Sequence, residues 1–186
     1  MSVLIKDTRI TPQEYLEGEE FSEYKHEYED GDIVAMVGAS RNHNIIQMNL
    51  SGALFNHLSG KPCRVFSSDM KIRLADTFYY PDLSVGCKME SHDQYMEHPL
   101  LVVEVFSPSS EKRDRSIKRL TYQQIPSLRE MLLLSQDAMT VECYRRIGNE
   151  WALEQYRKHE ILQLKCLNLS IPLQQIYDGV AFHKNI

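Results

Sequence analysis

The segment Pro99-Leu-Leu-Val-Val-Glu-Val-Phe106 constrains the fold more than any other stretch, because it is almost entirely apolar. Continuous apolar runs of this length are typical of strands buried on both faces of a sheet. Glu104 interrupts the run, and burying a carboxylate is costly unless a cation or strong hydrogen-bond donors compensate it. With a period of two, Glu104 shares a face with Val102 and Phe106. It is either in a structural ion pair with a distant Arg or Lys, or in a functional site, where perturbed carboxylates concentrate. We favour the functional site.

The remaining pattern predicts strands interrupted by a few helices, which is an α/β or mixed α+β fold. Helices are expected from the capping box at Thr11, over 40–59, and over 114–124 with Ile117 and Leu120 facing inward. The buried side of the helix at 40–59 is expected to consist of Ile45, Met48, Leu50, Leu54 and Leu58. Strands are expected at 63–75, 79–86, 100–106, 131–134 and 161–167, with hairpins over 24–37 and 140–157. The length of 186 residues favours one domain over residues 1–186.

Composition excludes several classes of protein. The apolar share of 42% and charged share of 25% are those of a globular chain. No stretch is long and apolar enough for a membrane span or a signal-peptide core. The four cysteines form no C-x-x-C pair, which argues against a zinc ribbon or redox motif. We therefore expect reduced thiols in a cytoplasmic protein.

Charge is unevenly distributed along the chain. The net charge of −5 argues against a general electrostatic coating of nucleic acid. However, residues 13–32 are strongly acidic, with Lys25 as their one base, while residues 111–119 are rich in Lys and Arg. The two patches would suit a metal site that meets a phosphate backbone, but charge alone favours the simpler interpretation of two solvated faces.

Asp82 is the natural partner of Glu104. It follows Pro81 at the start of a short strand, and the 12-residue connection to the next strand allows the two strands to lie side by side. Converging carboxylates repel each other unless a cation lies between them. Ligation by oxygen alone suits Mg²⁺ or Mn²⁺ rather than Zn²⁺. Taken by itself, Asp82 would be an ordinary turn residue.

Lys118 allows two interpretations. It lies four residues after Asp114 on the expected helix, so a surface ion pair between them is the simpler one. The functional alternative is that Lys118 brings its charge to a phosphate or to an attacking water. The histidines are scattered, and His43 and His57 are expected to be ordinary hydrogen-bonding residues of the helix at 40–59.

Five stretches in order resemble a known family. They are His26-Glu-Tyr-Glu-Asp-Gly-Asp-Ile-Val-Ala-Met36, Arg64-Val-Phe-Ser-Ser-Asp-Met-Lys-Ile-Arg73, Tyr80-Pro-Asp-Leu-Ser84, Leu101-Val-Val-Glu-Val-Phe-Ser-Pro-Ser109, and Asp114-Arg-Ser-Ile-Lys118 with Tyr122. Together they resemble a large bacterial family of proposed restriction endonucleases within the PD-(D/E)XK nuclease superfamily. The resemblance runs from about residue 11 to residue 146.

The resemblance implies a restriction-endonuclease-like core, with a mixed central sheet flanked by helices and extra C-terminal hairpin strands. It implies Asp82 and Glu104 as metal ligands, Glu27 as a further acidic residue and Asp114 as their support. The superfamily lysine would stand two residues after the glutamate, where this chain has Phe106; the basic role then passes to Lys118. The basic residues Lys112, Arg113 and Arg115 are expected to contact phosphates.

The expected activity is that of a Mg²⁺- or Mn²⁺-dependent endodeoxyribonuclease. The alternative is a nucleic-acid- or partner-binding module on a nuclease fold that no longer cleaves, which Phe106 and the net negative charge support. The strands after residue 140 could pair with a second subunit, and a homodimer would address both strands of a duplex. Nucleic acid, and DNA in particular, is the expected partner, and no membrane contact is expected.

Overall fold

The computed structural model describes residues 9–36, 38–88, 90, 92–106 and 114–182. A five-stranded sheet, called the N-terminal sheet below, consists of β1 (His26–Glu29), β2 (Asp32–Ala35), β4 (Lys71–Leu74), β5 (Thr77–Tyr79) and β7 (Tyr95–Met96), in the order β2-β1-β5-β4-β7. The expected hairpin is confirmed at Asp30-Gly31, where both residues have positive φ, as a tight two-residue turn requires. Helix α1 (Pro12–Glu20) begins with the expected capping box at Thr11.

A six-stranded sheet, called the central sheet, has the order β11-β10-β9-β8-β6-β3. Its strands are β3 (Arg64–Ser67), β6 (Leu83–Gly86), β8 (Pro99–Phe106), β9 (Glu130–Ser135), β10 (Thr140–Ile147) and β11 (Glu150–Arg157). Strands β8 and β9 are parallel and the other pairs are antiparallel. A two-stranded ribbon follows, formed by β12 (Ile161–Leu164) and β13 (Leu169–Pro172) around the 3₁₀ turn η2 (Lys165–Leu167).

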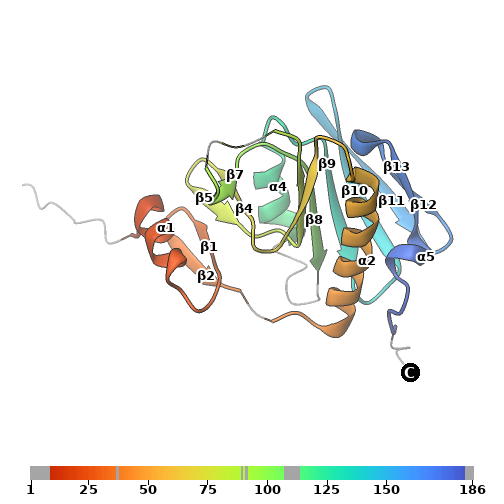
Figure 1. The fold of residues 1–186 in the computed structure, drawn as a ribbon, viewed down its shortest axis with the longest axis horizontal. Coiled ribbons are helices and arrows are strands. Elements are labelled where there is room, and N and C mark those ends of the chain that lie inside the picture. The colour runs from red at the N-terminus through yellow and green to blue at the C-terminus, as the bar shows by residue number, and fades with distance from the viewer. Residues whose placement is uncertain (1–8, 37, 89, 91, 107–113, 183–186) are drawn as a thin grey trace, which may run out of the picture.

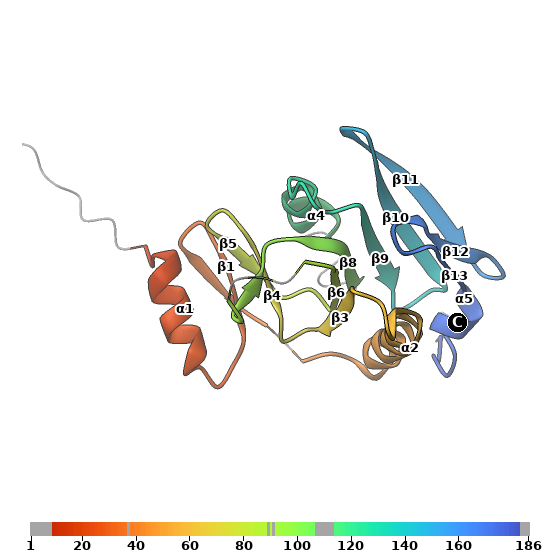
Figure 2. The same cartoon turned by 45° about the horizontal axis from the view of Figure 1, so that its top comes forward.

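Helices cover both faces of the central sheet (Figures 1 and 2). Helices α2 (Arg41–Leu58) and α5 (Leu173–Ile176) share one apolar cluster with Leu101, Val103 and Val105 of β8. On the other face, a π-helical turn, η1 (Asp114–Lys118), continues into α4 (Arg119–Tyr122), which packs near Val102 and Phe106. The mixed α+β architecture with C-terminal hairpin strands is thus confirmed. The alternation along β8 places Glu104 on the α4 side.

Two of the expected strands are wrong in extent. The segment 63–75 forms β3 and β4, and the segment 79–86 contains the end of β5 and all of β6. In each case the two strands belong to different sheets. A turn closed by the Met70 N–H on the Ser67 carbonyl separates the first pair, and Pro81 interrupts the second. The alternation of apolar and polar residues continues through both breaks, because it does not indicate to which sheet a strand belongs. The expected strand 161–167 likewise ends at Leu164, where η2 begins.

The expected orientation of the helix at 114–124 is also wrong. Ile117 and Leu120 are 48% and 54% exposed, whereas Lys118 and Tyr122 are buried. The wider π-helical turn changes the residue spacing, and buried carboxylates of the sheets face the position that Lys118 occupies. In α2, Met48 is exposed and Ile46 is buried in its place.

The expectation of reduced thiols is wrong for two of the four cysteines. Cys63 and Cys87 form a disulfide, and Cys143 and Cys166 are free. Because Arg64 of β3 pairs with Gly86 of β6, the preceding and following cysteines are brought opposite each other. Spacing along the chain could not show this pairing. No helix among the described residues is long and apolar enough to cross a membrane.

Candidate active site

Glu104 lies in the middle of β8 and is only 4% exposed. Its Oε1 atom accepts a hydrogen bond from the Tyr122 hydroxyl at 3.0 Å and another from Nζ of Lys118 at 3.3 Å. Both donors come from the helical segment on the same face of the central sheet. The buried carboxylate is therefore compensated by an ammonium group and a phenol, as its place in an apolar strand requires.

Lys118 is itself buried, with 8% of its side chain exposed. Its Nζ atom lies 2.7 Å from Oε1 of Glu27 and 5.5 Å from the centre of the Tyr79 ring. Lys118 and Tyr122 are four residues apart on one helical face, which explains why both reach Glu104. The interpretation of Lys118 as a surface residue is therefore wrong.

Glu27 reaches the same place from the N-terminal sheet. It is 3% exposed in β1, and its Oε1 atom accepts the Tyr80 N–H at 3.2 Å in addition to the Lys118 contact. Residue Tyr80 lies between β5 of the N-terminal sheet and β6 of the central sheet. The passage of the chain from one sheet to the other thus brings Glu27 to the same ammonium group as Glu104.

Asp82 immediately precedes β6, and the pairing of Leu83 with Val103 places it beside the end of β8. Its Oδ2 atom accepts the Val105 N–H at 2.6 Å and lies 3.1 Å from Nε2 of His43. Its backbone carbonyl accepts a hydrogen bond from Nε2 of Gln47 at 2.8 Å. In the described part of the chain, no hydrogen bond ends on Oδ1. One of the two carboxylate oxygens of Asp82 is therefore fixed by two contacts, and the other has none in this part of the chain.

The Tyr122 hydroxyl is held in its protonated form. Burial and, secondarily, the nearby carboxylates of Glu104 and Glu27 raise its pKa well above the usual value for tyrosine. The Tyr79 ring packs edge-on against Tyr122, with centroids 5.4 Å apart. Tyr122 therefore remains a hydrogen-bond donor to Glu104 at any ordinary pH.

The sequence did not identify His43 and Gln47 as residues that contact Asp82. His43 was expected to be an ordinary hydrogen-bonding helix residue, but it contacts the carboxylate of Asp82. The spacing of four residues between His43 and Gln47, just after the Ser40 cap, could have indicated a shared polar face. Nothing in the sequence indicated that Asp82 lies opposite that face.

The remaining expected site residues cannot be placed in the same way. Lys112 and Arg113 lie outside the described residues. Asp114 and Arg115 begin the π-helical turn, but their side chains are outside the described part as well. The supporting role of Asp114 and the phosphate contacts therefore stay predictions.

Three potential metal-ligating atoms lie within 4.8 Å of one another at a different place among the described residues, formed by Glu90, Glu97 and His98. Glu90 accepts the backbone N–H groups of Glu97 and His98, and its Oε2 lies 3.0 Å from Nδ1 of His98. The other ring nitrogen, Nε2, lies 3.1 Å from Nζ of Lys88. Because both nitrogens of the ring are engaged, we assign no metal there.

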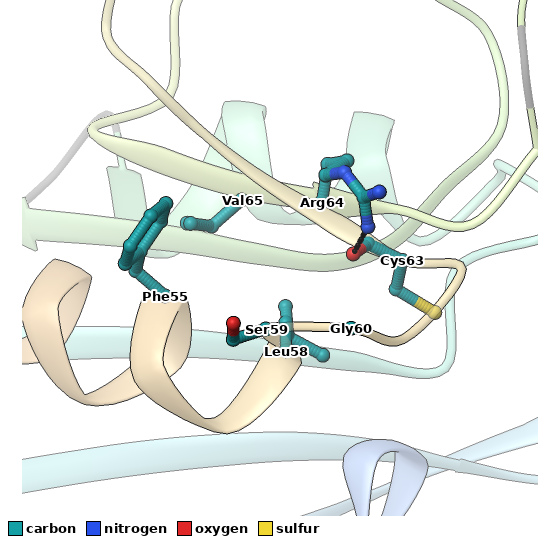
Figure 3. Close-up of a pocket in the computed structure, with 7 residues that line it drawn as sticks. All are labelled: Phe55, Leu58, Ser59, Gly60, Cys63, Arg64 and Val65. Carbon is teal, nitrogen blue, oxygen red and sulfur yellow. Dashed lines mark hydrogen bonds between the residues drawn. The ribbon is translucent and has the colours of Figure 1, made fainter.

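A hollow of about 260 Å³ lies between the C-terminal end of α2 and strand β3 (Figure 3). Phe55, Leu58 and Val65 form its apolar wall, and Arg64 is its single charged residue. It lies at the end of β3 where Arg64 pairs with Gly86, whereas Asp82 lies beyond the other end, where Ser67 pairs with Leu83. The hollow is therefore separate from the carboxylates.

The fold agrees with that of a solved structure. A crystal structure from Anabaena variabilis, described as a "putative nuclease belonging to DUF820", superposes with a TM-score of 0.77 and 18% identity, over 92% of this chain and 99% of that chain. This similarity and the mixed sheet with helices on both faces define a protein of the restriction-endonuclease-like fold.

The sequence comparisons identify the family. A model of the Uma2 family, described as "Putative restriction endonuclease", matches residues 12–174, and the chain belongs to this family. Two uncharacterized proteins of Synechocystis sp. are similar to it. One, slr1290, is 40% identical over 94% of both chains. The other, sll1609, is 33% identical over 82% of this chain and 90% of its own length.

Proposed function

We propose that this protein is a Mg²⁺- or Mn²⁺-dependent endodeoxyribonuclease that hydrolyses phosphodiester bonds at Asp82, Glu104, Glu27 and Lys118. The observation that carries the proposal is the burial of Glu27 and Glu104 against the ammonium group of Lys118, with a third buried carboxylate, Asp82, beside the strand that carries Glu104. None of the three acidic residues is more than 9% exposed. Such a set is costly to bury and is more typical of a functional site than of a structural ion pair. Membership in a family of proposed restriction endonucleases supports the same reaction class.

The residues present fit a hard divalent cation. Three carboxylates and one ammonium leave two formal negative charges, which a divalent ion would neutralise. Asp82 and Glu104 offer oxygen ligands at adjacent strands, and oxygen donors are those that Mg²⁺ and Mn²⁺ prefer. When bound, such a cation would supply Lewis-acid polarisation of the scissile phosphate.

The chain's own groups would supply the remaining steps. Asp82, fixed through Oδ2, and Glu104, fixed through Oε1, would each offer carboxylate oxygen to the cation. Lys118 would donate a hydrogen bond to the attacking water or to a phosphate oxygen and stabilise the developing negative charge. Glu27 would hold the Lys118 ammonium in place at 2.7 Å.

The proposed substrate is a DNA duplex. The basic residues Lys112, Arg113 and Arg115 would contact phosphates and position the chain without reading the sequence. A homodimer would place one site on each strand of the duplex, and we include it in the proposal as a symmetric arrangement.

One observation favours a second candidate function, a nucleic-acid- or partner-binding module that does not cleave. Phe106 stands where the superfamily lysine is expected, is 5% exposed, and packs into the apolar cluster near α4. If Lys118 cannot replace that lysine, the protein would bind DNA without cutting it.

The test is cleavage of supercoiled plasmid and of single-stranded DNA in Mg²⁺ and in Mn²⁺, compared with identically purified Asp82→Ala and Glu104→Ala proteins. We expect the wild type to cut and both variants to lose cutting and metal binding while remaining folded. Glu150→Ala, at an exposed position, is the matched control and should cut normally. DNA binding without cutting in either metal would favour the binding module. Normal Mn²⁺ binding by either site variant would contradict the assignment of that ligand.

A further inference from the structure

The first two turns of α2 hold Asp82 at two points. His43 contacts the carboxylate through Nε2, and Gln47, one turn later, donates to the backbone carbonyl. The Gln47 amide also donates to Oγ of Ser68 at 2.9 Å, just beyond β3. One face of α2 thus fixes both the side chain and the main chain of Asp82.

The hydrogen-bond pattern assigns the tautomer of His43. Because Oδ2 of Asp82 is an acceptor, the proton of the contact belongs on Nε2 of the imidazole. Nδ1 is buried and has no hydrogen-bond partner among the described residues. A buried N–H without an acceptor is more costly than a buried lone pair, so a proton on Nε2 rather than on Nδ1 fits this position.

The start of α2 is itself anchored to the end of β8. Ser40 caps the helix by accepting the His43 N–H at 3.1 Å, and its hydroxyl also bonds to Oε1 of Gln136. The Gln136 N–H in turn donates to the carbonyl of Phe106 at 3.4 Å. His43 therefore has a fixed position relative to the strand that carries Glu104.

We propose that His43 is a positioning residue that orients Asp82 for metal binding, an inference that rests on the proposed metal-dependent function. The His43 and Val105 N–H groups both hold Oδ2, so the carboxylate cannot rotate freely about its last bond. The second oxygen, Oδ1, therefore keeps one orientation, and the cation binds a carboxylate that is already ordered. Partners of this kind, which bind a metal ligand rather than the metal, typically change metal affinity by about 10–100-fold.

The experiment measures Mn²⁺ binding to the metal-free protein by titration calorimetry, without substrate. We expect His43→Ala to weaken binding by about 10–100-fold. His43→Gln, whose amide nitrogen can still donate toward Asp82, should recover most of the affinity. If His43→Ala does not fold, His43→Phe keeps the volume of the ring and removes the donor.

His57→Ala is the matched control, because His57 lies on the same helix but contacts the carbonyl of Leu167, away from Asp82. Its Mn²⁺ affinity should equal that of the wild type. Equal affinity in wild type, His43→Ala and His43→Gln would overturn the role of His43 and leave the proposed function intact. A loss that His43→Gln does not recover would also overturn it. If the wild type binds no Mn²⁺, the metal site itself is wrong, and the role of His43 is wrong with it.

Discussion

The Nζ atom of Lys118 lies 2.7 Å from Oε1 of Glu27 and 3.3 Å from Oε1 of Glu104. Glu27 belongs to the N-terminal sheet and Glu104 to the central sheet. One ammonium group from a helical segment therefore joins the two sheets at the candidate active site. Any change to Lys118 is expected to affect both the stability of this junction and the reaction proposed there.

Replacing Lys118 by Met should lower the free energy of unfolding by about 3–5 kcal/mol, because it removes the ammonium that two buried carboxylates share. Cleavage of DNA should fall by about 10²–10³-fold if Lys118 stabilises developing charge. Urea unfolding and plasmid cleavage measure the two effects. Lys165→Met is the control, since its Nζ lies 3.7 Å from Glu154 at an exposed position. Full activity in Lys118→Met would exclude Lys118 from catalysis.

Replacing Tyr122 by Phe should cost about 1.5–3 kcal/mol of stability, the range for a hydrogen bond to a charged group. The ring and its packing against Tyr79 are kept, so the change isolates the hydroxyl that Glu104 accepts. Tyr15→Phe is the comparison, because its buried hydroxyl donates to the neutral carbonyl of His26 and should cost only about 0.5–1.5 kcal/mol. Equal losses in the two variants would mean that the charge of Glu104 does not strengthen its bond to Tyr122.

The Cys63–Cys87 disulfide should stabilise the fold without affecting the site. It closes a loop with a sequence separation of 24 residues, for which loss of chain entropy in the unfolded state predicts about 2–4 kcal/mol. The double variant Cys63→Ser with Cys87→Ser should lose this amount in urea unfolding under oxidising conditions. Its Mn²⁺ affinity should be unchanged, because the bond lies at the opposite end of the β3–β6 pairing from Asp82. Four alkylatable thiols in the unfolded, non-reduced wild type would show that the bond is absent.

Stability should fall in acid partly through Glu154. The Tyr156 hydroxyl and then the Arg145 guanidinium lower the pKa of this carboxyl below its usual value of 4.5, although its partial burial acts in the opposite direction. Because the pKa is lower in the folded state, Glu154 contributes stability above the unfolded pKa and loses it as pH falls through the folded pKa. As the pH falls below about 4.5, the unfolding free energy of Glu154→Gln should therefore decrease less than that of the wild type. Urea unfolding at a series of pH values measures this difference, and an equal decrease in the variant and the wild type would exclude Glu154 as its source.

Part of the site was predictable from local sequence. Glu104 stood out because one carboxylate interrupts an apolar run, and burial in β8 requires the compensation that the structure provides. The hairpin at Asp30-Gly31 was predictable because few residues adopt positive φ at two successive positions. Glu27 and Lys118 were assigned to the site only through the resemblance to a family. Their residue patterns alone favoured a solvated acidic segment and a surface ion pair.

The chain by itself determined roughly where the longer helices and strands lie and that one strand carries a carboxylate in an apolar run, because backbone preference and apolar alternation are local properties. It did not determine where segments 63–75 and 79–86 pass from one sheet to the other. Tertiary structure decided that Lys118 rather than Ile117 faces inward, that His43 meets Asp82, and that Cys63 meets Cys87. These contacts join residues at least 14 positions apart, as between Glu104 and Lys118. Periodicity indicates that an element has a buried side, but which side that is, and which surface it faces, depend on how the two sheets and their helices pack.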